Sequence, residues 1–273
     1  MGVLVQKLIP SRFHANLSEP EMPPAIVPTG TGYDPKKLAE QITSSGFAVL
    51  ENYIGATDLK LAQRFVSAAV KKNGGNCVIF RGPREDLAGT FMYDLPKKPD
   101  FVKLCCDIYE AGTGNQAPKP DCYQVLRCLS GPLGKKNSMR FHFDTYMLAA
   151  LIPIMIPPQG PPGDLLILPN ARRVRKFYAS SLIDKVILAS TLKQRHLKNM
   201  HAHNDERLIR AKLIPGNLYL FWGYMSAHTN EECDADKIRS TALFHYFDPH
   251  ATSKLNNIIP TSRLKMIIRG NYR

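Results

Sequence analysis

His142 and Asp144 stand two residues apart in an otherwise apolar and aromatic run, RFHFDTYMLA at 140–149. On a β-strand, residues i and i+2 point to the same face, so the imidazole and the carboxylate are expected to converge. Such a pair can be a hydrogen-bonded pair within the core, or it can supply two of the three ligands of a metal ion. The motif by itself leaves both interpretations open.

A third ligand has to come from a distant strand, and the aromatic segment PGNLYLFWGYMSAH at 215–228 ends in His228. Two histidines and one carboxylate can occupy one face of an Fe(II) ion and leave the opposite positions open for a bidentate cosubstrate and O₂. Arg239 follows eleven residues later, with Thr241 two positions beyond it. A guanidinium can hold the distal carboxylate of such a cosubstrate by a planar two-point contact.

This ordered set of motifs resembles the Fe(II)/2-oxoglutarate-dependent oxygenases. It consists of H-x-D, GPPGDLLILPNARR at 160–173, the 215–228 segment and RST at 239–241. Within that family it is most similar to the phytanoyl-CoA hydroxylase branch, over roughly residues 40–250. The branch often has Gly-Ser where this chain has Asn170-Ala171. No substrate contact is therefore carried over from that loop, whereas the metal motif is intact.

The resemblance implies an α+β protein with a double-stranded β-helix (jelly-roll) core and helices packed outside it. It implies that His142, Asp144 and His228 hold iron. It also implies that Arg239, helped by the Thr241 hydroxyl, binds the C5 carboxylate of 2-oxoglutarate. The cofactor set is thus Fe(II), the cosubstrate 2-oxoglutarate, and O₂.

The implied reaction hydroxylates an unactivated C–H bond of a small substrate and releases succinate and CO₂. Relatives that halogenate typically have Gly or Ala at the carboxylate position. Asp144 therefore favours hydroxylation, and desaturation or cyclisation on the same iron stays open. Gln124, on the strand that precedes the metal motif, is expected to contact the cosubstrate or the substrate.

The composition of the 273-residue chain, with 44% hydrophobic and 22% charged residues, is typical of a soluble globular protein. The longest apolar run, at 147–158, is too short for a transmembrane helix, and the N-terminus lacks a secretory pattern. The six cysteines have no C-x-x-C spacing, which favours reduced thiols and a cytoplasmic location.

The net charge of +13 fits either solvated helix faces or attraction to an anionic partner, such as a substrate that carries a carboxylate or a phosphate. No nucleic-acid motif accompanies the charge, and peripheral contact with a membrane stays open. The sequence does not indicate an oligomeric state. The candidates to receive an anionic group are Arg81, Arg84, Arg127 and Arg140.

The predicted organisation is a single domain at 33–250, between an irregular proline-rich arm (1–32) and a basic tail (251–273). Helices come first. The signals for the first are Asp34-Pro35 at its start and Gly46 at its end, and Thr57 or Asp58 is expected to cap the second. Strand-like segments dominate after Pro120, apart from a helical insertion at 174–199.

Two other functions compete with the oxygenase interpretation. The HAHND segment offers His201, His203 and Asp205 to a metal-dependent hydrolase, although Glu206 stands where a binuclear hydrolase needs another histidine. A non-catalytic jelly-roll protein that binds an anionic ligand is the other, and the complete His-Asp-His set argues against it. The remaining histidines after Arg239, His245 and His250, are assigned to structure or surface.

Overall fold

The computed structural model describes residues 33–82 and 85–253. The arm at 1–32, Arg84 and the tail beyond residue 253 lie outside the described residues, so the predictions made for them stay untested. No helix within the described ranges is long and apolar enough to cross a membrane.

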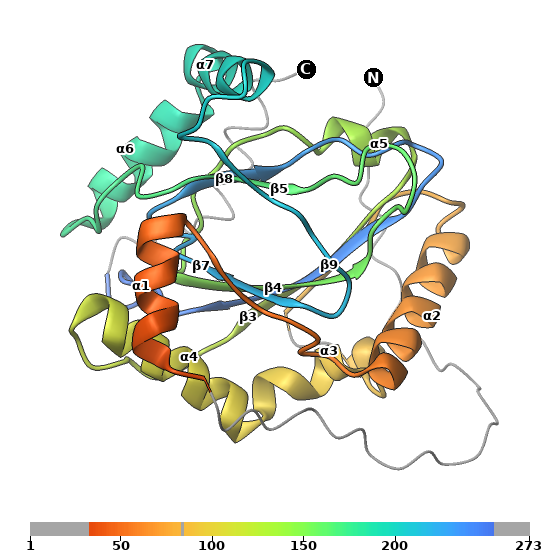
Figure 1. Cartoon of the computed structure of the whole chain (residues 1–273), viewed down its shortest axis with the longest axis horizontal. Coiled ribbons are helices and arrows are strands. Elements are labelled where there is room, and N and C mark those ends of the chain that lie inside the picture. The colour runs from red at the N-terminus through yellow and green to blue at the C-terminus, as the bar shows by residue number, and fades with distance from the viewer. Residues whose placement is uncertain (1–32, 83–84, 254–273) are drawn as a thin grey trace.

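The strands of the described chain form two sheets, one of six strands and one of three (Figure 1). Their bounds are β1 Ala48–Leu50, β2 Val78–Arg81, β3 Tyr123–Leu129, β4 Leu148–Met155, β5 Leu165–Leu168, β6 Ile209–Ala211, β7 Leu218–Phe221, β8 Ala227–Asn230 and β9 Arg239–Tyr246. The larger sheet has the order β1-β7-β4-β9-β3-β2 and the smaller one β6-β5-β8. All neighbouring strands are antiparallel. This confirms the predicted α+β class with a jelly-roll core.

Residues of β9 alternate between two environments. Phe244 and Tyr246 belong to the apolar core between the larger sheet and the helices. Leu243 packs instead with Leu165 and other residues between the two sheets. Because successive strand residues face opposite sides, the odd-numbered residues of β9, from Arg239 to His245, face the interior of the jelly roll.

Helices cover the outside of the larger sheet. They are α1 Pro35–Ser45, α2 Ala56–Lys72, α3 Phe91–Asp94 and α4 Pro99–Thr113, and two 3₁₀ turns, η1 Glu85–Leu87 and η2 Leu95–Lys97, lie among them. The remaining helices are α5 Gly131–Lys136, α6 Tyr178–Ala189 and α7 Thr191–Ala202. Figure 1 shows α6 and α7 beyond β5 and β8, on the opposite side of the sheets from α2 and α4. The helical insertion predicted at 174–199 is thus two helices.

The first helix has the caps that the sequence predicts. The Asp34 carboxylate accepts hydrogen bonds from the first-turn backbone at Lys36 and Lys37, and Gly46 ends the helix at φ 84°. A Cβ at Gly46 would lie 2.8 Å from Pro169, so this position needs glycine for two reasons. The second helix corrects a prediction: it begins at Ala56, so that Thr57 and Asp58 lie in its first turn.

Candidate metal centre

Three predicted ligands come together where β8 meets the segment before β4. One ligand atom from each of His142, Asp144 and His228 lies within 4.8 Å of the others, and this is the group of the described residues that could hold a metal ion. The backbones of His142 and His228 exchange two hydrogen bonds of 3.0 Å. That bridge brings a residue of irregular backbone beside a residue of β8 and lets the two imidazoles converge.

Backbone carbonyls orient both imidazoles. Nδ1 of His142 lies 3.2 Å from the Arg140 carbonyl oxygen, and Nδ1 of His228 lies 3.0 Å from that of Ser226. A carbonyl only accepts hydrogen bonds, so each Nδ1 carries a proton and each Nε2 is the atom left to bind a metal. Metal-binding histidines in proteins are held in this way. Both Nε2 atoms face Asp144, at 3.8 Å from Oδ1 and 3.4 Å from Oδ2.

The Asp144 carboxylate has the environment of a metal ligand. Its Oδ2 atom is buried and forms no hydrogen bond. Burial by itself would raise the pKa of this carboxyl, but the charges of His228, His245 and His142 outweigh burial and hold the pKa well below its usual value. A buried anionic oxygen without a donor is costly unless a cation meets it. The residues present therefore fit a metal ion.

A third histidine, His245 on β9, also reaches this carboxylate. Its Nε2 lies 3.4 Å from Oδ2 of Asp144, and its Nδ1 lies 3.2 Å from the Tyr123 carbonyl oxygen. The sequence predicts a structural or surface role for His245, and this contact with the metal ligand corrects that prediction. A signal was present, because His245 follows Arg239 by six residues, and an even spacing puts both on one face of a strand.

Side chains from the helical insertion hold the segment around His142 and Asp144. Gln194 of α7 bonds both backbone groups of Phe141, accepting from its N–H at 3.0 Å and donating to its carbonyl at 2.8 Å. Lys185 of α6 donates to the Thr145 hydroxyl at 3.0 Å. The helical insertion therefore supports the metal ligands through these contacts.

Arg172 is buried and also holds the segment around His142 and Asp144 in place. Its guanidinium stacks between the rings of Phe143 and Tyr224, 4.2 and 3.8 Å from their centroids. It donates to the carbonyl oxygens of Tyr224 at 2.7 Å and Asp144 at 3.4 Å, and lies 3.6 Å from the Asp184 carboxylate. In the sequence, Arg172 belongs to the basic run at 171–177, which predicts a solvent-exposed side chain. The structure corrects this, because Arg172 is 6% exposed.

The Arg239 guanidinium is buried on the interior face of β9, at the opposite end of this strand from His245. Arg239 donates from Nε to the Gly163 carbonyl at 2.6 Å, and within the described chain no carboxylate lies within 4 Å of it. Burial and then the charge of Arg127 lower its pKa to about 9. Gly163 has to be glycine here, because a Cβ would come within 2.6 Å of the Arg239 side chain. Arg239 therefore has the burial and free charge needed to bind a carboxylate.

Thr241 and Arg127 are neighbours of Arg239 on that face. Arg127 of β3 is directly opposite Thr241 of β9, and Thr241 is 1% exposed. Residues opposite each other in an antiparallel pair point to the same side of the sheet. The structure thus brings Arg127, predicted for the substrate, close to the predicted cosubstrate anchor.

Gln124 does not face the interior of the jelly roll. Gln124 is opposite Phe244, on the helix-covered face of the sheet, and donates to the Met92 carbonyl at 2.6 Å. The prediction that it contacts cosubstrate or substrate is therefore corrected. Arg81, at the end of β2, and Arg140 are both exposed.

The alternative HAHND ligands have other partners. His201 lies in the last turn of α7, and His203 follows that helix, with Nδ1 2.7 Å from the Asn199 carbonyl. Both Asp205 oxygens accept from the Arg207 guanidinium, at 2.9 and 2.7 Å. A carboxylate held by arginine in this way is not presented to a metal, so the structure does not support the hydrolase interpretation.

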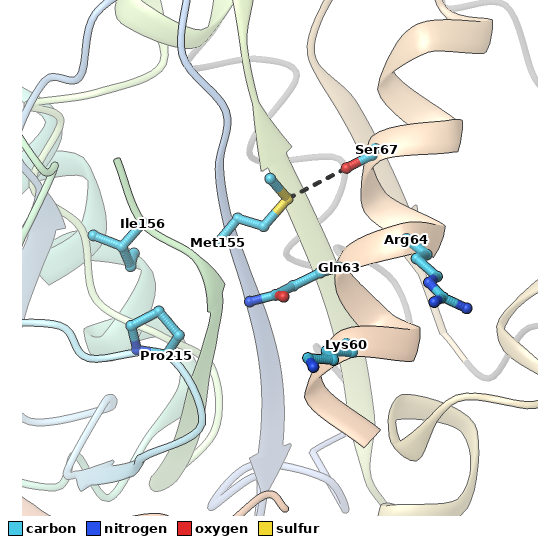
Figure 2. A pocket seen from close by; sticks show the side chains of 7 residues that line it. All are labelled: Lys60, Gln63, Arg64, Ser67, Met155, Ile156 and Pro215. Carbon is cyan, nitrogen blue, oxygen red and sulfur yellow. Dashed lines mark hydrogen bonds between the residues drawn. The ribbon is translucent and has the colours of Figure 1, made fainter. Parts of the chain in front are cut away.

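A surface groove lies elsewhere, between α2 and the end of β4 (Figure 2). Gln63 and Ser67 of α2 line it opposite Met155, and the Ser67 hydroxyl contacts the methionine sulfur at 3.8 Å. It contains none of the predicted site residues. The groove is therefore separate from the metal centre.

No protein-family model matches the chain, and no curated protein matches it in sequence. Solved structures do match. A prolyl-4-hydroxylase from Pseudomonas putida has 11% identity over 78% of this chain and 98% of its own, with a TM-score of 0.50. A Burkholderia pseudomallei oxidoreductase of the 2OG-Fe(II) oxygenase family has 11% identity over 80% and 91%, with a TM-score of 0.49. A Trichoplax adhaerens prolyl hydroxylase has 12% identity over 81% and 94%, with a TM-score of 0.47. The likeness is one of fold, and the chain shares the fold of the Pseudomonas enzyme.

Proposed function

We propose that this protein is a non-haem Fe(II)/2-oxoglutarate-dependent oxygenase that hydroxylates a C–H bond of a small anionic substrate. The observation that carries the proposal is a combination within one jelly roll. A His-Asp-His group with a buried carboxylate oxygen lies at one end of the interior, and toward the other end lies Arg239, which has no carboxylate partner among the described residues. The shared fold is compatible with this function.

His142, Asp144 and His228 are the residues that would hold the iron. When bound, Fe(II) with 2-oxoglutarate and O₂ supplies the oxidation of an unactivated C–H bond, with release of succinate and CO₂. The protein points both Nε2 atoms toward the carboxylate before the metal arrives, because Nδ1 of each imidazole is bonded to a carbonyl.

Arg239 is proposed to bind the C5 carboxylate of 2-oxoglutarate, with the Thr241 hydroxyl beside it. Burial makes this contact strong, since few water molecules compete for the guanidinium. Its Nε atom already donates a hydrogen bond to the Gly163 carbonyl, and this bond fixes the plane of the guanidinium group. Arg127 adds a second positive charge near this position.

The finer assignments rest on the sequence. Asp144 supplies a carboxylate ligand and so favours hydroxylation over halogenation. The motif order is most similar to that of the phytanoyl-CoA hydroxylase branch. Exposed Arg81 and Arg140 are the proposed contacts of an anionic substrate. A screen of 2-oxoglutarate turnover to succinate, over a panel of carboxylated and phosphorylated small molecules, would identify the substrate class.

Substitution of Arg239 tests the cosubstrate site. Truncating one partner of a buried charge pair costs about 2–5 kcal/mol, so Arg239→Ala should raise the apparent KM for 2-oxoglutarate roughly 30-fold or more. Arg239→Lys should fall between Arg239→Ala and the unmodified protein, because an ammonium cannot make the two-point contact. Arg173→Ala, at an exposed arginine, is the matched control and should leave this KM unchanged. An unchanged KM in Arg239→Ala would show that this arginine is structural.

A further inference from the structure

The outer surface of α6 is apolar, although a surface helix normally shows polar residues to water. Tyr178, Ser181 and Leu188 form the buried face. Ile183, Val186 and Ile187 follow the i, i+3, i+4 spacing of one helix face and are 58%, 50% and 56% exposed. With Val174 and Phe177 before the helix and Leu192 after it, at 47%, 64% and 77% exposed, they form what we call the α6 patch. An exposed apolar patch of this kind marks a binding surface.

Basic residues accompany the α6 patch. Residues 172–198 contain eight arginines and lysines and a single acidic residue, Asp184. That carboxylate is already paired with Arg175, at 2.7 Å. The exposed members are Arg173, Arg175, Lys176, Lys193, Arg195 and Lys198. The patch is therefore an apolar surface with a strongly positive surround.

This charge decides among the possible occupants. A second copy of the chain, docked through the same patch, would place two such basic surrounds against each other, which is unfavourable. The C-terminal segment 254–273 has five basic residues and no acidic residue, so the surround repels it. The N-terminal segment 1–32 has two basic and two acidic residues and brings no net negative charge.

We propose that the α6 patch docks on the surface of an anionic phospholipid bilayer. Aliphatic and aromatic side chains enter the boundary between headgroups and acyl chains, while the surrounding arginines and lysines meet the lipid phosphates. A polyanion such as a nucleic acid would engage the basic residues but would leave the aliphatic side chains in water. This inference does not depend on the proposed oxygenase activity.

Docking at this place would act close to the metal centre. Lys185 lies on α6 and bonds Thr145, which follows the ligand Asp144. Arg172 bonds the Ser181 backbone of α6 and the Asp144 backbone together, at 3.3 and 3.4 Å. The helix that meets the bilayer is thus the helix that supports the metal ligands.

Vesicle flotation of the full-length protein tests the proposal. The protein should float with vesicles of equal parts phosphatidylcholine and phosphatidylglycerol, and should remain behind with phosphatidylcholine alone. Ile183→Ser with Ile187→Ser should reduce partitioning roughly tenfold or more, because two exposed aliphatic side chains no longer enter the bilayer. Arg173→Gln with Lys176→Gln should reduce it roughly fivefold for each charge removed.

Two control variants carry the same changes elsewhere. Leu133→Ser with Ile214→Ser removes exposed apolar side chains outside the patch, and Lys60→Gln with Lys71→Gln removes exposed charges from α2. Both should float like the unmodified protein. The proposal is overturned if the full-length protein ignores the mixed vesicles, or if Ile183→Ser with Ile187→Ser floats unchanged. It is also overturned if that variant abolishes a dimer seen by sedimentation while vesicles are never bound.

Discussion

The metal centre has two halves that are held in place by different means. His228 lies on β8, which pairs with β5 along one edge, and His245 lies on β9, which pairs with β3 and β4 on its two sides. His142 and Asp144 lie on irregular backbone, joined to the sheets by one β-bridge and by a 2.9 Å hydrogen bond from the Asp144 N–H to Gly223. Further support for this second half comes from three long polar side chains, Arg172 just before the insertion and Lys185 and Gln194 within it.

The comparison shows that a ligand off the regular sheet needs side-chain support. A strand uses backbone hydrogen bonds that any sequence can make. The loop at 140–146 depends on particular residues that arrive from α6 and α7. Substitutions in those residues should therefore disturb both stability and metal affinity, whereas substitutions on the strands should affect the metal more selectively.

The largest effect should come from Arg172→Met. This change leaves Asp184 and the backbone carbonyls around the guanidinium without their buried donor, and breaking a buried charge pair costs about 3–5 kcal/mol. Chemical denaturation should show a loss of that size, and Fe(II) affinity should fall as well. Arg175→Met removes the other partner of Asp184, but from an exposed position, so little stability should be lost. Equal effects of the two variants would contradict the role given to Arg172.

Gln194→Leu should have the next largest effect. It removes three hydrogen bonds, two to Phe141 and one to Leu188, and each buried group left unpaired costs about 1–3 kcal/mol. Amide hydrogen exchange should then increase in residues 140–146 while β9 stays protected. Gln63→Leu, which removes a single bond from Gln63 to the Ile154 carbonyl, is the matched control. An equal increase in amide hydrogen exchange in residues 140–146 and in β9 would contradict the claim that the two halves are held by different means.

His245→Gln tests the half held by strands. Residues beside metal ligands change metal affinity about 10- to 100-fold when altered, and His245 touches the Asp144 carboxylate. Fe(II) affinity should therefore fall by that amount, with unfolding by denaturant nearly unchanged because the strand pairing remains. His196→Gln, at an exposed histidine of α7, should change neither quantity. A variant that unfolds more easily but binds iron normally would make His245 a structural residue.

The smallest effect should come from His201→Ala with His203→Ala. These residues lie at the end of α7 and belong to neither half of the metal centre. Fe(II) affinity and 2-oxoglutarate turnover should stay within about twofold of the unmodified protein, since substitutions at surface positions are usually close to neutral. Loss of metal in this variant, together with retention in the Asp144 variants, would favour the hydrolase.

Strand periodicity relates the spacing of residues to the face they share, and it predicted three of the four residues of the metal centre, missing His245 in the half held by strands. The i, i+2 spacing of His142 and Asp144 correctly predicted that their side chains converge, although this segment forms a single β-bridge and not a regular strand. Gln124 shows the limit of this argument. Spacing along one strand does not give its register against the next, and an error of one residue moves a side chain to the other face. Gln124 is opposite Phe244 and so faces the helices.

Arg172 shows a second limit. In sequence it belongs to the basic run ARRVRK, which looks like a solvated surface. Its burial arises from Phe143 and Tyr224, which lie far away in the chain and supply the two rings around the guanidinium. No local pattern records such a contact. Side chains that support a site from outside the regular elements are therefore the part least accessible to sequence reasoning.

The central claim is that Asp144 and its two histidines bind Fe(II) together with 2-oxoglutarate. Anaerobic titration of Fe(II) and then 2-oxoglutarate, followed by visible absorption, tests it most directly. The unmodified protein should develop the weak visible charge-transfer band of a chelated cosubstrate. Asp144→Asn, which keeps the shape of the side chain but removes its charge, should bind Fe(II) weakly and develop no band. A full-strength band in Asp144→Asn, or none in the unmodified protein, would contradict the account.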